Sequence, residues 1–148
     1  MKIFIASRGV AENIMKNNQD ITHIVSIGAD EPRQSPPKSL QKYAAQKLRL
    51  EFFDISCEKR KNMNGPSEKD INKLILFYQE ALKTENPTFL IHCLAGKSRS
   101  VAAGLILLRM IYKDEKKAYE ELAKIASNIS PNTRMLDIAD NILKNLRA

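Results

Sequence analysis

The chain has 148 residues, of which 43% are hydrophobic and 28% are charged, a composition typical of one globular domain. This length argues against separate cofactor and substrate domains, and the longest apolar run, Val101 to Leu108, is too short to cross a bilayer. The formal net charge of +7 predicts attraction to anions such as phosphorylated proteins, phosphoinositide headgroups or nucleic acid. Because the lysines are scattered along expected helices, we interpret the excess as a solvated basic face rather than a nucleic-acid site.

Two cysteines, Cys57 and Cys93, are too few for a disulfide framework, and no Cys or His residues have the spacing of zinc ligands. No metal or cofactor is therefore expected. The first seven residues carry one lysine and a strand-like apolar stretch, which is too little for a secretory signal. We expect a cytoplasmic protein without stable membrane insertion.

The first part of the chain predicts two strands with a helix between them. Ile3 to Ala6 is apolar and strand-like, and residues 10–17 are compatible with a helix. Ile21 to Ile27 is rich in β-branched residues, as expected of a strand buried on both faces, and Gly28 to Asp30 ends it. The side chains expected to face inward from the helix are Val10, Ile14 and Met15.

The next part predicts a proline-rich loop, a short helix, a strand and a long polar loop. Three prolines between Asp30 and Pro37 predict the first loop, and Lys38 to Gln46 is expected to form the helix. Leu48 to Phe53 alternates in polarity like a strand that stops at Asp54. Residues 54–66 are polar without a period, and a loop of this length in a small domain is more often functional than idle.

Ser67 and Asp70 have the spacing of a capping box, which predicts the start of an amphipathic helix. Its apolar stripe is expected to contain Ile71, Leu74, Ile75, Tyr78 and Leu82. Thr88 to Ile91 predicts a short strand that runs directly into a His-Cys pair. Residues 101–112 are apolar on almost all sides, as in a central helix packed by several neighbours.

Two further helices are expected to close the chain, one over residues 114–126 and one that starts at Ser130 and Pro131. The apolar side chains expected to face inward from the second are Met135, Ile138, Ile142, Leu143 and Leu146. Strands that alternate with helices predict an α/β fold, a mainly parallel four- to five-stranded sheet flanked by helices, in a single domain over residues 1–148. Ligands bind beyond the carboxyl ends of such strands, so the loops after Phe53 and after Ile91 are the candidate site.

The segment from His92 to Ser100 lies between an expected strand and an expected helix. Backbone N–H groups in such a loop, together with the positive end of the following helix, form a cradle for a doubly charged phosphate. Arg99 can hold two phosphate oxygens with its planar guanidinium. The same positive field favours the thiolate of Cys93, the form that attacks phosphorus. The candidate phosphate-loop residues are Leu94, Ala95, Gly96, Lys97, Ser98 and Arg99.

These residues resemble the signature of the cysteine-dependent protein tyrosine phosphatase superfamily, in which His-Cys is followed by five residues and then Arg-Ser/Thr. His92, Cys93, Arg99 and Ser100 match it. By size the chain is most similar to the dual-specificity subgroup, and its Ala-Gly-Lys-Ser-Arg-Ser loop and Pro131-Asn132 resemble predicted bacterial members. Low-molecular-weight phosphatases place their loop near the N-terminus, and rhodanese loops are usually one residue shorter, so both families fit less well.

The resemblance implies hydrolysis of a phosphate ester through a phosphocysteine on Cys93, with an aspartate on an upstream loop as general acid and then general base. Asp54 ends a strand and opens the long loop, and it is therefore the preferred candidate. Glu58 is the next candidate, whereas Asp70 already has a capping role.

Ser100 is expected to donate its hydroxyl to the Cys93 sulfur, and His92 to hydrogen-bond the loop backbone as structural support. Cys57 lies three residues after Asp54. We interpret it as a free loop cysteine, with a disulfide to Cys93 as the alternative.

Lys97 places a positive charge in the loop and resembles phosphatases that act on phosphoinositides, but Leu94 stands where those commonly carry a second basic residue. We therefore predict a phosphatase for phosphotyrosine, with phosphoserine and phosphothreonine as further substrates. A phosphoinositide or inositol phosphate phosphatase is one alternative, and a catalytically silent module that binds phosphate groups is another. The expected partner is a phosphorylated protein or another phosphomonoester; nucleic acid is the weakest alternative.

Overall fold

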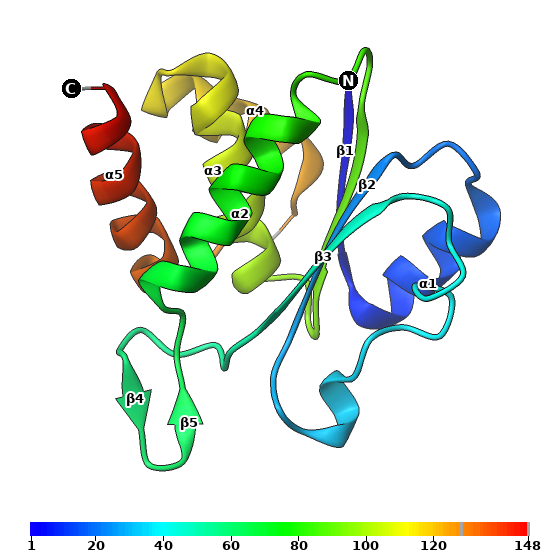
Figure 1. The fold of residues 1–148 in the computed structure, drawn as a ribbon, viewed down its shortest axis with the longest axis horizontal. Coiled ribbons are helices and arrows are strands. Elements are labelled where there is room, and N and C mark those ends of the chain that lie inside the picture. The colour runs from blue at the N-terminus through cyan, green and yellow to red at the C-terminus, as the bar shows by residue number, and fades with distance from the viewer. Residues whose placement is uncertain (128, 148) are drawn as a thin grey trace.

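In the computed structural model, which describes residues 1–127 and 129–147, four parallel strands form one sheet in the order β1-β6-β2-β3 (Figure 1). The strands are β1 (Lys2–Ser7), β6 (Thr88–Cys93), β2 (His23–Gly28) and β3 (Gln46–Glu51). Within the described residues the α-helices are α1 (Arg8–Asn17), α2 (Glu68–Ala81), α3 (Arg99–Tyr112), α4 (Glu115–Ile125) and α5 (Thr133–Arg147). The expected α/β fold, a mainly parallel sheet flanked by helices, is confirmed.

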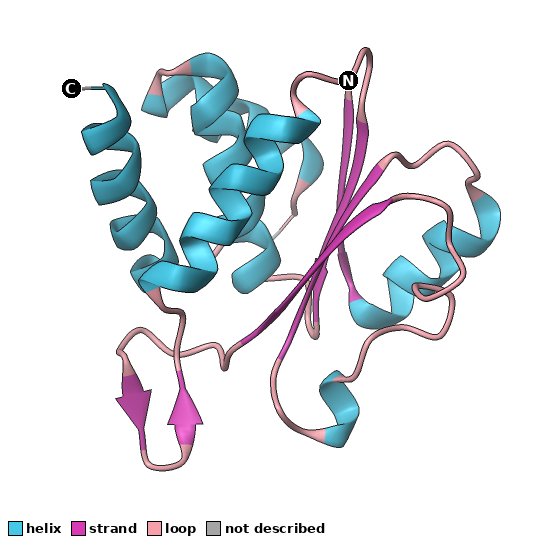
Figure 2. Ribbon diagram, viewed as in Figure 1, coloured by secondary structure: helices cyan, strands magenta, loops and turns pink. Residues whose placement is uncertain are grey.

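The helices cover the two faces of the sheet unequally, with α1 on one side of the strands and the other four on the opposite side (Figure 2). Side chains alternate along β1, so Phe4 and Ala6 belong to the core under α1, whereas Ile3 and Ile5 pack with residues of α3 and α4. The largest core cluster joins β2, β3 and β6 to α2, α3 and α5. The two central strands, β6 and β2, are thus buried on both faces, as their apolar sequences predict.

Helix α3 is the central helix that its sequence predicts. Every residue from Arg99 to Leu108 is buried. Because α3 follows β6 after only five residues, its packing in the core determines where the connecting loop lies. None of the described helices is long and apolar enough to span a bilayer.

The capping box at the start of α2 is confirmed. The Ser67 hydroxyl accepts a hydrogen bond from the Asp70 backbone nitrogen (3.1 Å), and the Asp70 carboxylate accepts one from the Ser67 nitrogen (3.0 Å). Four of the five side chains expected to face inward from α2 are buried, namely Ile71, Leu74, Ile75 and Tyr78.

Three side chains expected in the core are exposed instead. Val10 is 51% exposed, because Ala11 and Met15 form the inward face of α1. Leu82, the fifth of the predicted stripe on α2, follows the last helical residue and is 37% exposed. Leu146 is 59% exposed, because it lies beyond the packed part of α5.

The helix expected from Lys38 to Gln46 is wrong. Residues 38–43 form turns, and β3 already begins at Gln46. Leu40 is buried in the core beside α1, and the Glu12 carboxylate accepts a hydrogen bond from the Ser39 backbone nitrogen (2.6 Å). These contacts with α1 stabilise the turn conformation of the segment, and this tertiary packing outweighs its local preference for a helix.

The long loop after β3 contains a small antiparallel hairpin, β4 (Lys59–Arg60) and β5 (Met63–Asn64), which projects from the rest of the protein (Figure 1). Its base is held by backbone hydrogen bonds from Phe53 to Asn64 (2.7 Å) and from Gly65 to Glu58 (2.9 Å). The loop is therefore folded and has a fixed position relative to the end of β3.

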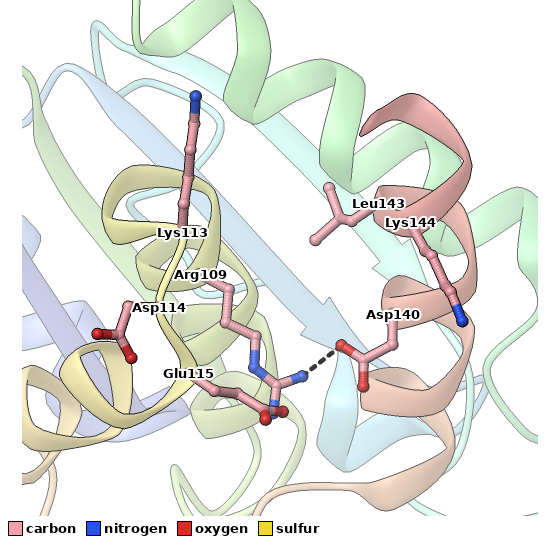
Figure 3. Close-up of a pocket in the computed structure, with 7 residues that line it drawn as sticks. All are labelled: Arg109, Lys113, Asp114, Glu115, Asp140, Leu143 and Lys144. Carbon is pink, nitrogen blue, oxygen red and sulfur yellow. Dashed lines mark hydrogen bonds and ion pairs between the residues drawn. The ribbon is translucent and has the colours of Figure 1, made fainter. Parts of the chain in front are cut away.

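A hollow of about 310 Å³ lies where α3, α4 and α5 meet (Figure 3). Arg109 of α3 lies between Glu115 and Asp140, with N–O distances of 2.8 and 2.7 Å. Arg109 is about 15 Å along the helix from Arg99, away from the loop that precedes α3. These ion pairs join three helices, and we interpret the hollow as structural.

Gly28→Ala is expected to destabilise the fold, because an added Cβ would lie 2.2 Å from the Gln34 carbonyl oxygen and 2.3 Å from Arg49 Nη2. Relieving these clashes means moving the backbone of Gln34, at a cost of about 1–3 kcal/mol. Gly9→Ala is the control: its Cβ would meet nothing within 4 Å, and alanine favours a helix by roughly 0.5–1 kcal/mol. Urea unfolding followed by circular dichroism measures both, and a Gly28→Ala protein as stable as the wild type would contradict this packing.

Candidate active site

Two groups that can donate hydrogen bonds lie near the Cys93 sulfur, one in the loop between β6 and α3 and one in the first turn of α3. The Gly96 backbone nitrogen lies 3.2 Å from Sγ, and Ser100 Oγ lies 3.1 Å from it. Gly96 has a φ of 73°, and a Cβ there would lie 2.5 Å from the backbone nitrogen of Ser7, so only glycine fits. The tight turn of the loop therefore directs an N–H group at the sulfur, and the expected contact of Ser100 with Cys93 is present.

The Arg99 guanidinium is buried at the first turn of α3 and bonds only to uncharged groups. The side chain is 4% exposed. Its Nη1 donates to the Phe52 carbonyl oxygen (2.7 Å) and its Nη2 to Gln34 Oε1 (2.8 Å). The Nε hydrogen is buried and has no partner, and among the described residues no carboxylate forms an ion pair with Arg99. Burial lowers the pKa of Arg99, whereas the nearby Cys93 and Asp54 act in the opposite direction. An arginine remains protonated in proteins, so the site contains a buried positive charge that is not directly paired with a carboxylate of the described residues.

Cys93 and Arg99 line one cleft of about 570 Å³ at the carboxyl end of the sheet. Charged Lys97 and Asp54 stand at this cleft together with Gln34 and Ser98. The remaining lining side chains are apolar: Phe53, Ile55, Met63, Leu94 and Ala95. The cleft thus combines cations and a thiol with walls that can contact an aromatic or aliphatic group.

Asp54 is held at the cleft by two side-chain donors. Its Oδ1 accepts hydrogen bonds from Ser98 Oγ (2.7 Å) and from Asn132 Nδ2 (2.8 Å). Asn132 Nδ2 also donates to the Ile55 carbonyl oxygen (3.1 Å), and the Asn132 backbone nitrogen donates to the Ser98 carbonyl oxygen (3.2 Å). Asn132 therefore joins the loop of Asp54 to the loop between β6 and α3.

The other candidates lie elsewhere. Glu58 is exposed at the base of the hairpin and is not among the described residues that line the cleft. Asp70 caps α2. Cys57 and Cys93 are both free, and Cys57 Sγ contacts the Lys59 carbonyl oxygen at 3.6 Å, so this structure contains no disulfide between them. Within the described residues, no group of three or more Cys, His, Asp or Glu side chains could hold a metal ion.

His92 is buried beneath the loop in a hydrogen-bonded chain. Its Nδ1 lies 3.3 Å from the Cys93 carbonyl oxygen, and its Nε2 lies 2.7 Å from Ser26 Oγ, which in turn accepts from Arg49 Nη1 (2.9 Å). Burial lowers the pKa of His92 to about 4, and nearby guanidiniums act in the same direction. A neutral ring must carry its hydrogen on Nδ1 to bond the carbonyl, so Nε2 accepts from the Ser26 hydroxyl. His92 thus bonds the backbone of Cys93, as its expected supporting position requires.

Sequence reasoning assigned no role at the site to two of its residues, Gln34, which it did not single out, and Asn132, which it noted only as part of the family resemblance. Gln34 belongs to the short 3-10 helix Pro32–Gln34 inside the loop expected after β2, and only the folded chain brings it to Arg99. Asn132 lies just before α5, which begins at Thr133 rather than at Ser130 and Pro131. Its Oδ1 accepts from the nitrogen of Met135 (3.0 Å), which is the behaviour of a helix N-cap, and the known preference of Asn for that position was the available signal.

Comparison with known proteins identifies the fold. Neither the sequence models of known protein families nor the curated proteins match this chain. Among solved structures, PTPMT1 in complex with PI(5)P has a TM-score of 0.69 and 18% identity, covering 99% of this chain and 92% of its own. Human DUSP28 has a TM-score of 0.69 and 17% identity, with coverage of 98% and 93%. A human tyrosine phosphatase-like serine/threonine/tyrosine-interacting protein has a TM-score of 0.69 and 20% identity, with coverage of 97% and 88%.

The chain therefore has the fold of the cysteine-dependent protein tyrosine phosphatases, of the dual-specificity type, over nearly its whole length. This agrees with the resemblance found in the sequence.

The depressed pKa of His92 predicts that the protein loses stability in acid. The unfolded chain binds this proton near pH 6.5 and the folded one only near 4, so the contribution is complete above pH 6.5 and is lost as pH falls toward 4. The loss is about 3 kcal/mol. Urea unfolding between pH 7.5 and 4.5 measures it.

A His92→Asn variant is expected to have a shallower pH dependence over this range. His23→Asn is the comparison variant, because burial also lowers the pKa of His23 and this variant measures how much of the pH dependence the other histidine contributes. If the free energy of unfolding falls equally with decreasing pH in His92→Asn and in the wild type, His92 does not titrate as described.

Proposed function

We propose that this protein is a cysteine-dependent phosphatase for phosphomonoesters, with phosphotyrosine as the principal substrate and phosphoserine and phosphothreonine as further ones. The observation that supports this most strongly is the buried Arg99 guanidinium in the same cleft as Cys93, which has a free Nε hydrogen and no direct carboxylate partner among the described residues. A buried charge that bonds directly only to neutral groups is costly, and a phosphate dianion bound beside it would pair with it. Residues 1–148 would act as one catalytic domain.

In the first step the Cys93 thiolate attacks phosphorus opposite the leaving oxygen. The S–P bond forms, the P–O bond to the alcohol or phenol breaks, and the leaving oxygen takes a proton from the Asp54 carboxylic acid. Backbone N–H groups of the loop and the Arg99 guanidinium bind the phosphoryl oxygens throughout. The apolar walls of the cleft suit the ring of a phosphotyrosine.

In the second step a water molecule hydrolyses the phosphocysteine. Asp54, now a carboxylate, takes a proton from this water. The water oxygen bonds to phosphorus at the same time, and the S–P bond breaks. The Ser100 hydroxyl and the Gly96 N–H, both near Sγ, stabilise the thiolate that leaves. Inorganic phosphate then departs, and Asp54 is again protonated for the next cycle.

A phosphoinositide or inositol phosphate is the second candidate substrate. It is favoured by Lys97, whose exposed side chain lines the cleft. A module that binds phosphate groups without turnover is less consistent with the site, because Cys93 and Asp54 line the same cleft.

Cys93→Ser is expected to lower turnover of p-nitrophenyl phosphate by roughly 1,000-fold or more, because the hydroxyl is a far weaker nucleophile than a thiolate. Phosphate binding should persist, because the loop N–H groups and Arg99 remain. Initial rates in EDTA measure the first effect, and the increase in Tm on adding inorganic phosphate measures the second. Hydrolysis retained in this variant would end the proposal.

Asp54→Ala is expected to lower kcat for a phosphotyrosine peptide by about 100-fold or more and to flatten the basic side of its pH profile. The loss should be smaller for p-nitrophenyl phosphate, whose leaving group needs little protonation. Asn132→Ala should lower kcat in the same direction but less, because Asn132 acts by positioning Asp54. In an Asp54→Ala background it should add little further loss of kcat. A pH profile unchanged in Asp54→Ala would assign the acid elsewhere.

A further inference from the structure

The hairpin next to the cleft carries the only run of cations that stands out in the sequence, Lys59-Arg60-Lys61. Arg60 and Met63 are direct partners in the antiparallel pair, so their side chains lie on the same face of the hairpin. Met63 lines the cleft of Cys93. Arg60 lines a second pocket of about 280 Å³. One face of the hairpin therefore contributes to both hollows.

The second pocket adjoins the cleft directly. Both are lined by Asp54, Ile55 and Ser98, so the two hollows lie on either side of these residues. The second pocket is walled mainly by polar side chains, among them Ser130 and Thr133. A chemical group bound in this pocket would therefore lie beside a substrate whose phosphate is at Cys93. The hydroxyl groups that line the pocket could donate hydrogen bonds to the bound group.

Among the described residues, Arg60 is the only cation that lines the second pocket. Its side chain is exposed, and within residues 1–127 and 129–147 it forms neither an ion pair nor a side-chain hydrogen bond. The lining carboxylate in this part of the chain is Asp54, which bonds Ser98 and Asn132 through Oδ1 and forms no ion pair with Arg60. The charge of Arg60 is thus available to an anion from outside the chain.

We propose that Arg60 determines specificity by binding a second anionic group of a phosphopeptide, next to the phosphotyrosine in the peptide sequence. The inference rests on the proposed function and names the substrate class for the same site. The second group would be the carboxylate of an acidic residue or the phosphate of a second phosphorylated residue. Either one accepts hydrogen bonds from a guanidinium in the same forked geometry.

A peptide fits these two hollows better than a phosphoinositide headgroup. The Cα atoms of neighbouring peptide residues lie about 3.8 Å apart, so the side chain next to the phosphotyrosine can reach a pocket that shares its wall with the cleft. This needs a bent peptide backbone, because a regularly extended one directs successive side chains to opposite sides. Apolar groups such as Met63, Ile55 and Leu94 suit the tyrosine ring. A headgroup with several phosphates would need several converging cations, whereas Arg60 is the one cation that the described residues contribute to the second pocket.

The test compares three phosphotyrosine peptides that differ at the adjacent residue: glutamate, phosphoserine or glutamine. The wild type is expected to have the higher kcat/KM for the two anionic peptides. Arg60→Ala should lower kcat/KM for these by about 3- to 5-fold, the upper part of the range for losing a solvent-exposed ion pair, and should leave the glutamine peptide and p-nitrophenyl phosphate unchanged. The difference between the two anionic peptides identifies which anion is preferred.

Lys59→Ala is the matched control, because Lys59 lies beside Arg60 on the same strand but does not line the pocket. An equal loss in Lys59→Ala and Arg60→Ala would mean a general electrostatic field and would overturn the proposal. No preference for anionic peptides in the wild type would also overturn it. The proposal would also be overturned if Arg60 raised activity on phosphoinositides in phosphatidylcholine vesicles while the three peptides were hydrolysed equally.

Failure of the proposed function is detected separately, as absence of p-nitrophenyl phosphate turnover by the wild type. In that case fluorescence anisotropy measures binding of the same labelled peptides to the wild type and to Arg60→Ala. Tighter binding of the anionic peptides that is lost in Arg60→Ala would support the role of Arg60 in binding a second anionic group, even on a non-catalytic protein. Equal binding of all three peptides would overturn that role.

Discussion

The structure depends on one buried charge. The Arg99 guanidinium lies inside the protein between loops that follow three different strands, and it bonds to the Phe52 carbonyl and the Gln34 amide oxygen. Both acceptors are neutral, so they orient the guanidinium without cancelling its charge. A carboxylate in place of Gln34 would pair with this charge and compete with a phosphate dianion for it. The choice of uncharged partners leaves a positive field at the carboxyl end of β6, where the Cys93 sulfur lies.

The parallel sheet makes this arrangement possible, because it brings the carboxyl ends of all its strands to one edge. Close backbone approaches then fix the distances between the loops. Gly28 leaves no room for a side chain beside the Gln34 carbonyl, and Gly96 leaves none beside the end of β1. Arg49 bonds both Ser26 and the Gln34 carbonyl, so the chain beneath His92 and the loop that holds Arg99 share one anchor. The relative positions of the loops that carry the site residues are thus determined by the packing of the backbone beneath them.

The sequence alone predicts the parts of this protein whose signals are local. The buried strands have continuous apolar sequences, Ser67 and Asp70 are close in sequence, and the spacing of Cys93 and Arg99 lies within one loop. The wrong and missing predictions concern long-range partners. Residues 38–43 form turns because α1 supplies Glu12 and an apolar surface, which no pattern in the segment itself reveals. Gln34 and Asn132 bond groups that are 65 and 78 positions away, so their place at the site follows only from the folded chain.

The hydrogen bonds of Asp54 to Ser98 and Asn132 have a kinetic consequence. The segment that carries this carboxylate is joined to the loop between β6 and α3 by these hydrogen bonds, and the hairpin behind it is closed by its own backbone bonds. The entropy of ordering this segment is therefore lost when the chain folds. Under the proposed function, chemistry would begin from a preorganised ground state, and no loop would have to close before Asp54 transfers its proton.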